Sequence, residues 1–519
     1  MTAEDELIQL REAKRLLHEQ VGLQKQVIAQ QQEHIRLLEQ QAAQQQEQMG
    51  LLVTENSLLA QRVSQLTHEV KRLTAQVKTL QERLTKDSHN SHLPPSSDRF
   101  TRQPRSLRKK SGKKSGGQAG HPGQSLSFSP TPDEVVVHAV RHCQHCQADL
   151  GQVPAMIIER RQVVEVPLPR VLVREHQAEQ KHCPVCQQQT RASFPAEVRA
   201  PVQYGSSIGA IAVYLVQQQL LPWARACEVM EDLLGIQLCE GTLRELIERC
   251  AEQLTEVEQQ IKQALGTAQV LHQDETGLYV AASRLWMHVT STGRLTHYQV
   301  HPCRGHDALE AIGILPGFRG MSVHDGFGSY FRYDCQHALC NVHVLRDLIF
   351  LAEEQGWWWA AKLKRLLLDM KEATEHARAE GKHWLHPLEV VDWERQFLAL
   401  LDEGDQAHPR ATAPPGHRGR VKQSAARNLL DRLRTYQHAV LAFLEDLRVP
   451  FDNNLAERDL RMVKVQQKVS GCFRTLAGAH AFARIRGYLS TLRKQGIPLL
   501  SALQATLLGH PVLPSFQTT

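Results

Sequence analysis

The sequence predicts a multidomain chain: a long N-terminal coiled coil, a zinc-ribbon module, a helical segment, and an α/β core interrupted by an all-helical insertion. Three observations support this fold class. A heptad repeat spans residues 7–84, two Cys-x-x-Cys pairs follow it, and short β-rich runs then alternate with helical stretches. A chain of 519 residues has ample length for several domains, each with its own core.

The heptad repeat predicts a coiled coil over residues 1–86. Of the 23 a and d positions between residues 7 and 84, 18 are apolar. From Asn56 to Leu84 the repeat has mainly valine at a and leucine at d, a combination that favours parallel dimers, and Asn56 at an a position would fix the register. The alternative is a long helix that folds back on its own domain. We therefore expect a homodimer or a higher oligomer.

Residues 87–134 interrupt every periodicity and predict a basic flexible linker. Residues 99–114 contain eight basic residues and no acidic one, so removing their +8 from the net charge of +6 leaves −2 for the rest of the chain. Such a run binds polyanions or is simply solvated. The cations that would contact a polyanion are Arg108, Lys109, Lys110, Lys113 and Lys114.

Two Cys-x-x-Cys pairs predict a structural zinc site in residues 135–195. The pairs are Cys143 with Cys146 and Cys183 with Cys186. Together they supply the four thiolates of a closed tetrahedral Zn²⁺ site, which contributes folding energy rather than chemistry. Strand-like runs at 134–140 and 162–176 would form a ribbon around the metal. Four unrelated buried thiols and a redox pair are the alternatives.

Composition supports this interpretation of the cysteines. Eleven cysteines, four of them in these pairs, indicate metal binding in a reducing cytoplasm rather than a disulfide framework. The sequence has no apolar run of about 18 residues and no hydrophobic signal region at its start. Both observations argue against membrane and secreted proteins.

Residues 196–262 are predicted to be helical. They contain a helix, a break at Gly235 and a second helix from about Glu240, a pattern that fits a DNA-binding helix-turn-helix. Any hairpin of two helices with an apolar face would look the same, and the second helix carries both Arg244 and Glu245. The pattern alone therefore does not decide whether this segment binds DNA.

The rest of the chain is predicted as an α/β core in two parts. Residues 263–350 alternate β-rich runs with turns and form the first part, and residues 447–495 form the second. Residues 351–446 between them are predicted to be a helical insertion, with the tryptophans at 357–359 in its core. Residues 496–519 are predicted to be a C-terminal tail.

Three carboxylates lie where a ligand could reach them. Asp274 ends the run QVLHQ and Asp325 ends GMSVH, which places each at a sheet edge, although a strand-ending turn is the alternative for each. Glu457 lies near the start of a helix, where Asn454-x-x-Glu457 also has the spacing of a capping box. Three carboxylates from separate segments can hold two Mg²⁺ ions, with Mn²⁺ as a substitute, for in-line attack on a phosphodiester.

The helical face of Glu457 also carries three cations. Arg461, Lys464 and Lys468 follow Glu457 at +4, +7 and +11. A solvated helical face would more often mix charges of both signs. We therefore expect a metal ligand beside three residues that contact DNA phosphates.

In combination, these motifs resemble those of the insertion sequence 66 family of transposases. The resemblance covers almost the whole chain and rests on NSHLPPSSD, GGQAGHPG, the two cysteine pairs, QDET, HDGFGSY, ALCNVHVLRDL and DNNLAERDLR. It implies an RNase H-like catalytic core whose DDE triad is Asp274, Asp325 and Glu457. The 132-residue spacing between the last two agrees with a helical insertion inside the core.

The resemblance also places Cys340 and His343, a Cys-x-x-His motif, beside the active site, where they would organise the substrate or a flipped end nucleotide. A buried structural pair is the alternative, and a second zinc site would need ligands that the sequence does not identify. One departure concerns Gln187, which follows the second cysteine pair where glycine is common and so predicts a looser turn.

By this resemblance the chain would be a DNA transposase that binds the terminal inverted repeats of its element. It would hydrolyse phosphodiester bonds at the ends and join the freed 3′-hydroxyls to target DNA. Its partners would be DNA, further copies of the chain and accessory proteins of the same element, without a membrane, in the cytoplasm at the nucleoid. A zinc-containing DNA-binding regulator whose core no longer cuts DNA, and a coiled-coil scaffold, are the alternatives.

Overall fold

The computed structural model describes residues 45–84, 86, 89–91, 126–166, 171–413, 419 and 421–518. The chain divides into two units, Met1–Lys86 and Asp87–Thr519. The first half of the heptad repeat and the basic run at 99–114 lie outside the described residues. Within the described part, no helix combines the length and the apolar character needed to cross a membrane.

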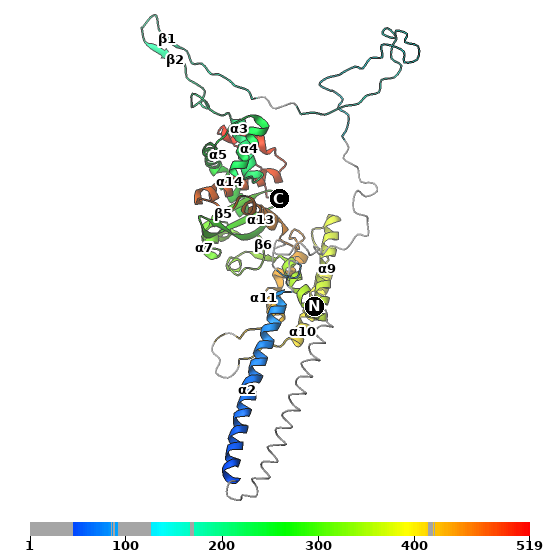
Figure 1. The fold of residues 1–519 in the computed structure, drawn as a ribbon, viewed down its shortest axis with the longest axis vertical. Helices are drawn as coiled ribbons and strands as arrows, with labels where there is room; N and C mark the ends of the chain where they lie inside the picture. The colour runs from blue at the N-terminus through cyan, green and yellow to red at the C-terminus, as the bar shows by residue number, and fades with distance from the viewer. Residues whose placement is uncertain are drawn as a thin grey trace. The chain divides into compact units, whose positions relative to one another are not determined.

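The described part of the first unit is helix α2 (Gln45–Leu84) (Figure 1). Seven of its a and d side chains are 47% to 62% exposed. They are Leu59, Val63, Leu66, Val70, Leu73, Val77 and Leu80. The helix is confirmed over these residues, and its pairing into a coiled coil stays a prediction.

The second unit contains a five-stranded mixed sheet in the order β5-β4-β3-β6-β7. Its strands are β3 (Val270–Val280), β4 (Ser283–Ser291), β5 (Thr296–His301), β6 (Met321–His324) and β7 (Gln336–Leu339). The first three form an antiparallel meander, and β6 and β7 continue the sheet in parallel with β3. Helix α7 (His306–Ile312) lies between β5 and β6 in the chain.

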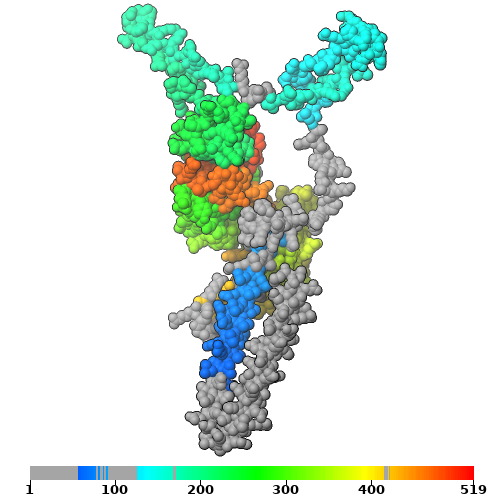
Figure 2. Space-filling model, in the orientation of Figure 1, coloured from blue at the N-terminus to red at the C-terminus, as the bar shows by residue number. Residues whose placement is uncertain are grey.

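Two helices that follow the helical insertion in the sequence pack on this sheet. Helix α13 (Asn454–Ser470) packs on β3 and β4, and α14 (Leu476–Lys494) packs on β5 (Figure 1). Ala456, Leu460 and Val463 recur at helical spacing and are buried in the core that α13 shares with the sheet. Figure 2 shows the result at the surface, where orange residues from this late segment lie between green ones from residues 205–330.

A helical layer covers α14. It consists of α3 (Ser206–Val213), α4 (Trp223–Leu234), α5 (Glu240–Gln253), α6 (Thr255–Gly266) and α15 (Leu499–Leu507). Gly235 ends α4 in the left-handed conformation, with φ of 65°, so the predicted helix, break and second helix are confirmed. The predicted C-terminal tail contains α15, because Ala502 and Leu503 are buried in this layer.

The predicted all-helical insertion is confirmed. After α8 (Asn341–Ile349) and a π-helical turn it contains α9 (Trp358–Ala379), α10 (Pro387–Ala407), α11 (Ala425–Thr435) and α12 (Gln437–Glu445). Trp359 is fully buried, whereas Trp358 is 51% exposed and Trp357 is half-buried. The predicted core is confirmed for Trp359, against whose cluster Trp357 also packs, and is wrong for Trp358. Consecutive residues of a helix point in directions about 100° apart, so Trp358 and Trp359 cannot both face the core.

Residues 126–204 contain little regular structure. Strands β1 (Gln180–His182) and β2 (Gln189–Arg191) form a hairpin around the second cysteine pair. The predicted strand-like runs at 134–140 and 162–176 form no strands in their described residues, and Val135 and Val163 are 72% and 81% exposed. That prediction is wrong because nothing covers the apolar side chains, and an apolar strand is stable only when one face is buried.

Candidate active site

The parallel pairing of β3 with β6 brings two of the predicted carboxylates together. The register pairs His272 with Val323, so two residues further along both strands Asp274 stands beside Asp325. Asp325 directly follows β6, as predicted. Asp274 does not end its strand, because β3 continues to Val280 in its hairpin with β4.

Glu457 reaches this edge of the sheet from the first turns of α13. The N-cap of that helix is Asn453, which makes no side-chain capping bond, so the alternative of a capping box between Asn454 and Glu457 is wrong. The Glu457 carboxylate instead faces Cys340 and His343. The three predicted catalytic carboxylates thus come from β3, the end of β6 and α13.

These carboxylates act on one another electrostatically. Burial raises the pKa of Asp274 well above its usual value, and the charges of Glu275, Asp325 and Glu457 raise it further. The oxygens of the three predicted ligands are not gathered within 4.8 Å of one another among the described residues. Carboxylate oxygens are the ligands that Mg²⁺ prefers, so the residue types, rather than a measured spacing, fit such ions.

A second buried carboxylate, Glu275, lies beside Asp274. It accepts a hydrogen bond of 2.5 Å from the Tyr330 hydroxyl and one of 2.8 Å from Arg304 Nε. Arg304 Nη2 also lies 3.9 Å from Asp325 Oδ2. Burial and the charge of Asp325 raise the pKa of Glu275, and its bonds with Tyr330 and Arg304 oppose this. Arg304 is thus a cation shared by Glu275, to which it is hydrogen-bonded, and Asp325, which it approaches.

Asn453 links the start of α13 to the sheet. Its side-chain amide donates to the Gln273 carbonyl at 2.7 Å, and its Oδ1 lies 2.9 Å from His272 Nδ1. Its backbone N–H donates to Cys340 Sγ at 3.2 Å. These contacts hold the end of α13 that carries Glu457 against β3.

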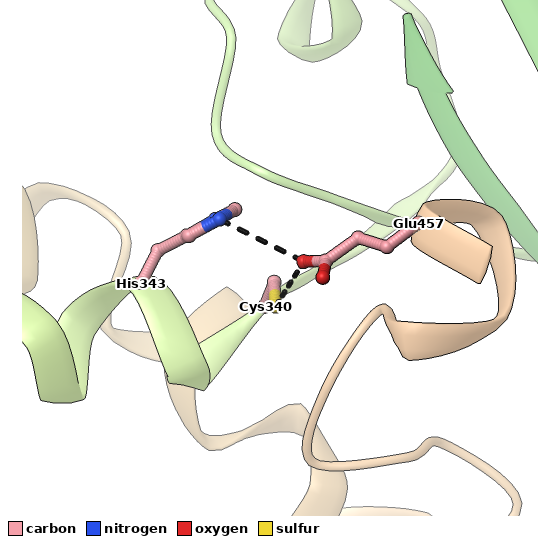
Figure 3. Close-up of side chains that lie close together, drawn as sticks. All are labelled: Cys340, His343 and Glu457. Atoms are coloured by element: carbon pink, nitrogen blue, oxygen red, sulfur yellow. Dashed lines mark hydrogen bonds and ion pairs between the residues drawn. The ribbon is translucent and has the colours of Figure 1, made fainter. Parts of the chain in front are cut away.

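Cys340 and His343 lie directly beside Glu457 (Figure 3). Glu457 Oε1 is 3.9 Å from Cys340 Sγ and 3.7 Å from His343 Nε2. Burial raises the pKa of Glu457, and the charges of Arg346 and Arg461 oppose this. The placement of the Cys-x-x-His motif next to the third carboxylate agrees with the predicted supporting role, which stays a prediction.

An open hollow of about 440 Å³ adjoins Glu275, the residue that follows Asp274 in the sequence. Its lining includes Glu275, Tyr279, Arg284, Trp286, Arg304 and Lys464. Arg284 and Arg304 each lie over the Trp286 ring, at 4.7 and 5.1 Å from its centroid. Lys464 Nζ donates to the Gly277 carbonyl at 2.6 Å. The hollow is therefore cationic and aromatic, a combination that suits a nucleic-acid strand.

The three predicted cations of α13 differ in where they lie. Lys464 lines the hollow, and the charge of Arg461 acts on Glu457. Lys468 is exposed in the last turn of α13. The structure therefore places Lys464 and Arg461 near the carboxylates, whereas Lys468 lies further along the helix.

Comparison with known families identifies the chain. The family described as "Transposase IS66 family" matches residues 201–481, which is more than half of the sequence. The chain belongs to the IS66 family of transposases. A family of unknown function, DUF6444, matches residues 5–127, and no curated protein matches.

Membership of the transposase family implies an enzyme of DNA transposition that binds DNA and uses divalent metal ions. The mixed sheet with its helices is consistent with a DDE core. The match includes the carboxylates of β3, β6 and α13 and the helical insertion between the last two.

The two cysteine pairs of the transposase form matching turns. Cys143 N–H donates to the Ala148 carbonyl and Cys183 N–H to the Gln188 carbonyl, both at 2.9 Å. The residue after each pair, Gln147 or Gln187, has φ near 60°. The predicted looser second turn is therefore wrong, because Gln187 adopts the left-handed conformation that the turn requires.

Each turn favours a thiolate at its first cysteine. Backbone N–H groups of Cys146 and His145 lower the pKa of Cys143, and those of Cys186 and Val185 lower the pKa of Cys183. The four sulfurs are nevertheless not gathered into one group in the described part of the chain. Both Cys-x-x-Cys turns are formed, and the zinc site itself stays a prediction.

The other predicted DNA-binding residues remain untested. The exposed face of α5 carries Arg244, Glu245, Glu248 and Arg249, and Arg244 Nε lies 3.7 Å from Glu248 Oε1. This mixed face does not favour the interpretation as a recognition helix. Arg108, Lys109, Lys110, Lys113 and Lys114 lie outside the described residues.

Sequence reasoning missed Glu275, Arg304 and Asn453. Glu275 directly follows Asp274 in QDET, and Asn453 belongs to the polar run DNN before α13, so both had a local signal. Arg304 had none, because its contacts with Glu275 and Asp325 depend on the tertiary fold.

Proposed function

We propose that the chain is a DNA transposase that binds the terminal inverted repeats of its element and catalyses Mg²⁺-dependent strand cleavage and strand transfer on an RNase H-like core. The observation that supports this most directly is the meeting of Asp274, Asp325 and Glu457, from three separate segments, at one edge of the sheet. The cationic hollow lined by Glu275 and Arg304, of which Arg304 also approaches Asp325, would offer a path for the strand that is cut.

The donor set fits Mg²⁺, with Mn²⁺ as a substitute. Asp274, Asp325 and Glu457 would hold two ions. The pKa of Asp274 is raised first by burial and then by the negative charges of Glu275, Asp325 and Glu457, which cations would neutralise. When bound, such ions activate a water or a 3′-hydroxyl and stabilise the leaving oxygen.

The chain's own side chains would position the DNA. Arg304 holds Glu275 and approaches Asp325, which orients the carboxylates before DNA arrives. Lys464 and Arg461 would contact phosphates near the cut, with Lys468 further along the backbone. Tyr279, 53% exposed beside the hollow, offers a surface on which a base could stack.

The other regions would assemble the reaction. The exposed apolar stripe of α2 supports pairing of two copies through the coiled coil, which suits a reaction that must hold two DNA ends. A structural Zn²⁺ at the four paired cysteines and the basic run would add DNA contacts. Accessory proteins of the same element and a place at the nucleoid in the cytoplasm complete the proposal.

The test is a cleavage and strand-transfer assay on DNA that carries the element's ends, with Mg²⁺. Wild-type protein should cut the ends and join them to a target, whereas Asp274→Asn should bind the ends without cutting. A wild type that binds its ends and never nicks them at any concentration of divalent metal would overturn the proposal. That outcome would favour the zinc-containing regulator.

A further inference from the structure

The Cys340, His343 and Glu457 group has the composition of a site for a softer metal than Mg²⁺. Their ligand atoms all lie within 4.8 Å of one another (Figure 3). A tetrahedral Zn²⁺ ion with bonds of about 2.0–2.3 Å separates its ligand atoms by about 3.4–3.6 Å. The distances of 3.9 Å from Glu457 Oε1 to Cys340 Sγ and 3.7 Å to His343 Nε2 exceed this by only a few tenths of an ångström.

We propose that Cys340, His343 and Glu457 bind a thiophilic divalent cation of the Zn²⁺ type, and that this cation competes with Mg²⁺ for Glu457. The competition rests on the proposed function, whereas the binding does not. Thiolate and imidazole bind Zn²⁺ well and Mg²⁺ poorly, so the two cations select different partners for the same carboxylate. Zinc at this site would hold the transposase in an inactive state.

The local fold supports the site in two ways. Cys340 is the N-cap of α8 and His343 lies in its first turn, so the Cys-x-x-His spacing turns both side chains toward Glu457. Burial and the charge of Glu457 raise the pKa of Cys340 to about 12, so the thiol would lose its proton only to a bound cation; the Asn453 N–H, which points at Cys340 Sγ, would favour that thiolate. On binding, the sulfur–hydrogen bond of Cys340 breaks, a sulfur–metal bond forms, and the proton leaves to solvent.

Three protein ligands leave the fourth tetrahedral position to water. Glu457 would then be held on the side of α8, away from Asp274 and Asp325 on the sheet. Removing one of three Mg²⁺ ligands should be enough to stop the reaction, because the ions need all three segments at once.

The first test counts metal on the full-length chain. Protein saturated with Zn²⁺ and freed of excess should hold one more ion per chain than Cys340→Ser or His343→Gln. With Co²⁺ as the probe, the difference spectrum between wild type and Cys340→Ser should show thiolate-to-metal absorption. The absorption from Co²⁺ at the two Cys-x-x-Cys pairs is present in both proteins and cancels in that difference. The control is Cys472→Ser, an exposed cysteine outside the group, which should bind as wild type does.

Equal metal content in wild type and both variants would overturn the proposal. His343→Gln keeps this test decisive if Cys340→Ser fails to fold, because His343 is only partly buried. Circular dichroism identifies a variant that has lost its fold.

The second test measures competition. Zn²⁺ should inhibit DNA cleavage at fixed Mg²⁺, more Mg²⁺ should relieve the inhibition, and His343→Gln should need at least about tenfold more Zn²⁺ for half-inhibition. Inhibition of His343→Gln at the wild-type Zn²⁺ concentration would contradict the competition. A wild type that never cleaves DNA would refute the proposed function alone, since the metal count tests the site without activity.

Discussion

The core and the cysteine module of residues 126–204 position their predicted metal ligands in two different ways. In the core, packing and hydrogen bonds bring the carboxylates together: β3 pairs with β6, and Asn453 joins α13 to β3. In the module, each Cys-x-x-Cys turn is formed by its own backbone bonds, and the two turns are not gathered. The predicted ligands of the core are therefore held by tertiary contacts, whereas in the module only the two separate cysteine turns are held in place.

The difference follows from what each region can bury. Leu278, Val289 and Leu460 are buried in the core, whereas the valines of the module are largely exposed. A region that buries little apolar surface must obtain its folding free energy elsewhere, and a structural metal is a common source. The comparison predicts that metal is essential to the fold of the module and to the chemistry of the core.

Zinc removal should have the largest effect, and only on the module. A strong chelator, or Cys183→Ser, should make residues 126–204 rapidly cleavable by protease, because structural zinc contributes on the order of 10 kcal/mol. Residues 205–413 and 421–518 should resist. Limited proteolysis with mass spectrometry measures this, and Cys472→Ser is the matched control. Unchanged protection of the module after chelation would break the comparison.

Removal of a core carboxylate should abolish most of the activity and leave the fold intact, whereas zinc removal should unfold the module. Asp325→Asn should slow DNA cleavage on the order of 10³-fold or more. It should leave the unfolding temperature unchanged or higher, because it removes negative charge from beside Asp274 and Glu275. Single-turnover cleavage and thermal unfolding measure the two effects.

Asp334→Asn, an exposed carboxylate in the next loop, is the control for this variant. It should leave both the cleavage rate and the unfolding temperature unchanged. Joint loss of activity and fold in Asp325→Asn would mean that the carboxylate is structural.

The same contrast explains what could be predicted from the sequence. Local patterns predicted α2, the helical insertion, the break at Gly235 and the carboxylate that follows β6. Non-local pairing could not be predicted. The bond from Asn453 to Gln273 joins residues 180 apart, and the contact of Cys340 with Glu457 joins residues 117 apart.

Predictions failed where a local pattern needed a tertiary partner. The apolar run at 134–140 has the composition of a strand, but nothing covers it. Asp274 resembled a strand end because a polar residue followed an apolar run, whereas the hairpin partner β4 extends the strand through it. Local sequence patterns do not show which distant segment will pair with a strand or cover its apolar face.

Loss of the hydrogen bonds made by Asn453 should reduce the stability of the core by an amount between the effects of zinc removal and of mild acid. Asn453→Ala removes the bonds to Gln273 and His272 and leaves buried groups without partners, so the unfolding free energy of the core should fall by about 2–3 kcal/mol. Cleavage should also slow, because Glu457 is held less firmly. Urea unfolding measures the loss, and Asn454→Ala, whose side chain is exposed, is the control. A wild-type unfolding free energy in Asn453→Ala would remove this link from the account of the core.

Mild acid should produce the smallest effect per residue, and the core and the module should respond to it through different groups. Burial lowers the pKa of His288 to about 4 and of His297 to about 3, below the usual value of about 6.5 in the unfolded chain. The unfolded state therefore binds more protons, so the contribution of each histidine is complete above pH 6.5 and is lost as the pH falls toward 3–4. At pH 5 each should have cost the core about 2 kcal/mol.

Tryptophan fluorescence isolates the core in this experiment, because residues 126–204 contain no tryptophan. In urea unfolding followed by fluorescence, His297→Gln should lose about 2 kcal/mol less than wild type between pH 7.5 and pH 5. The exposed His438→Gln should behave as wild type. Protonation of thiolates also releases zinc, so the module should respond to acid through its metal and the core through its buried histidines. An identical pH dependence in His297→Gln and wild type would show that His297 is not the group through which acid reaches the core.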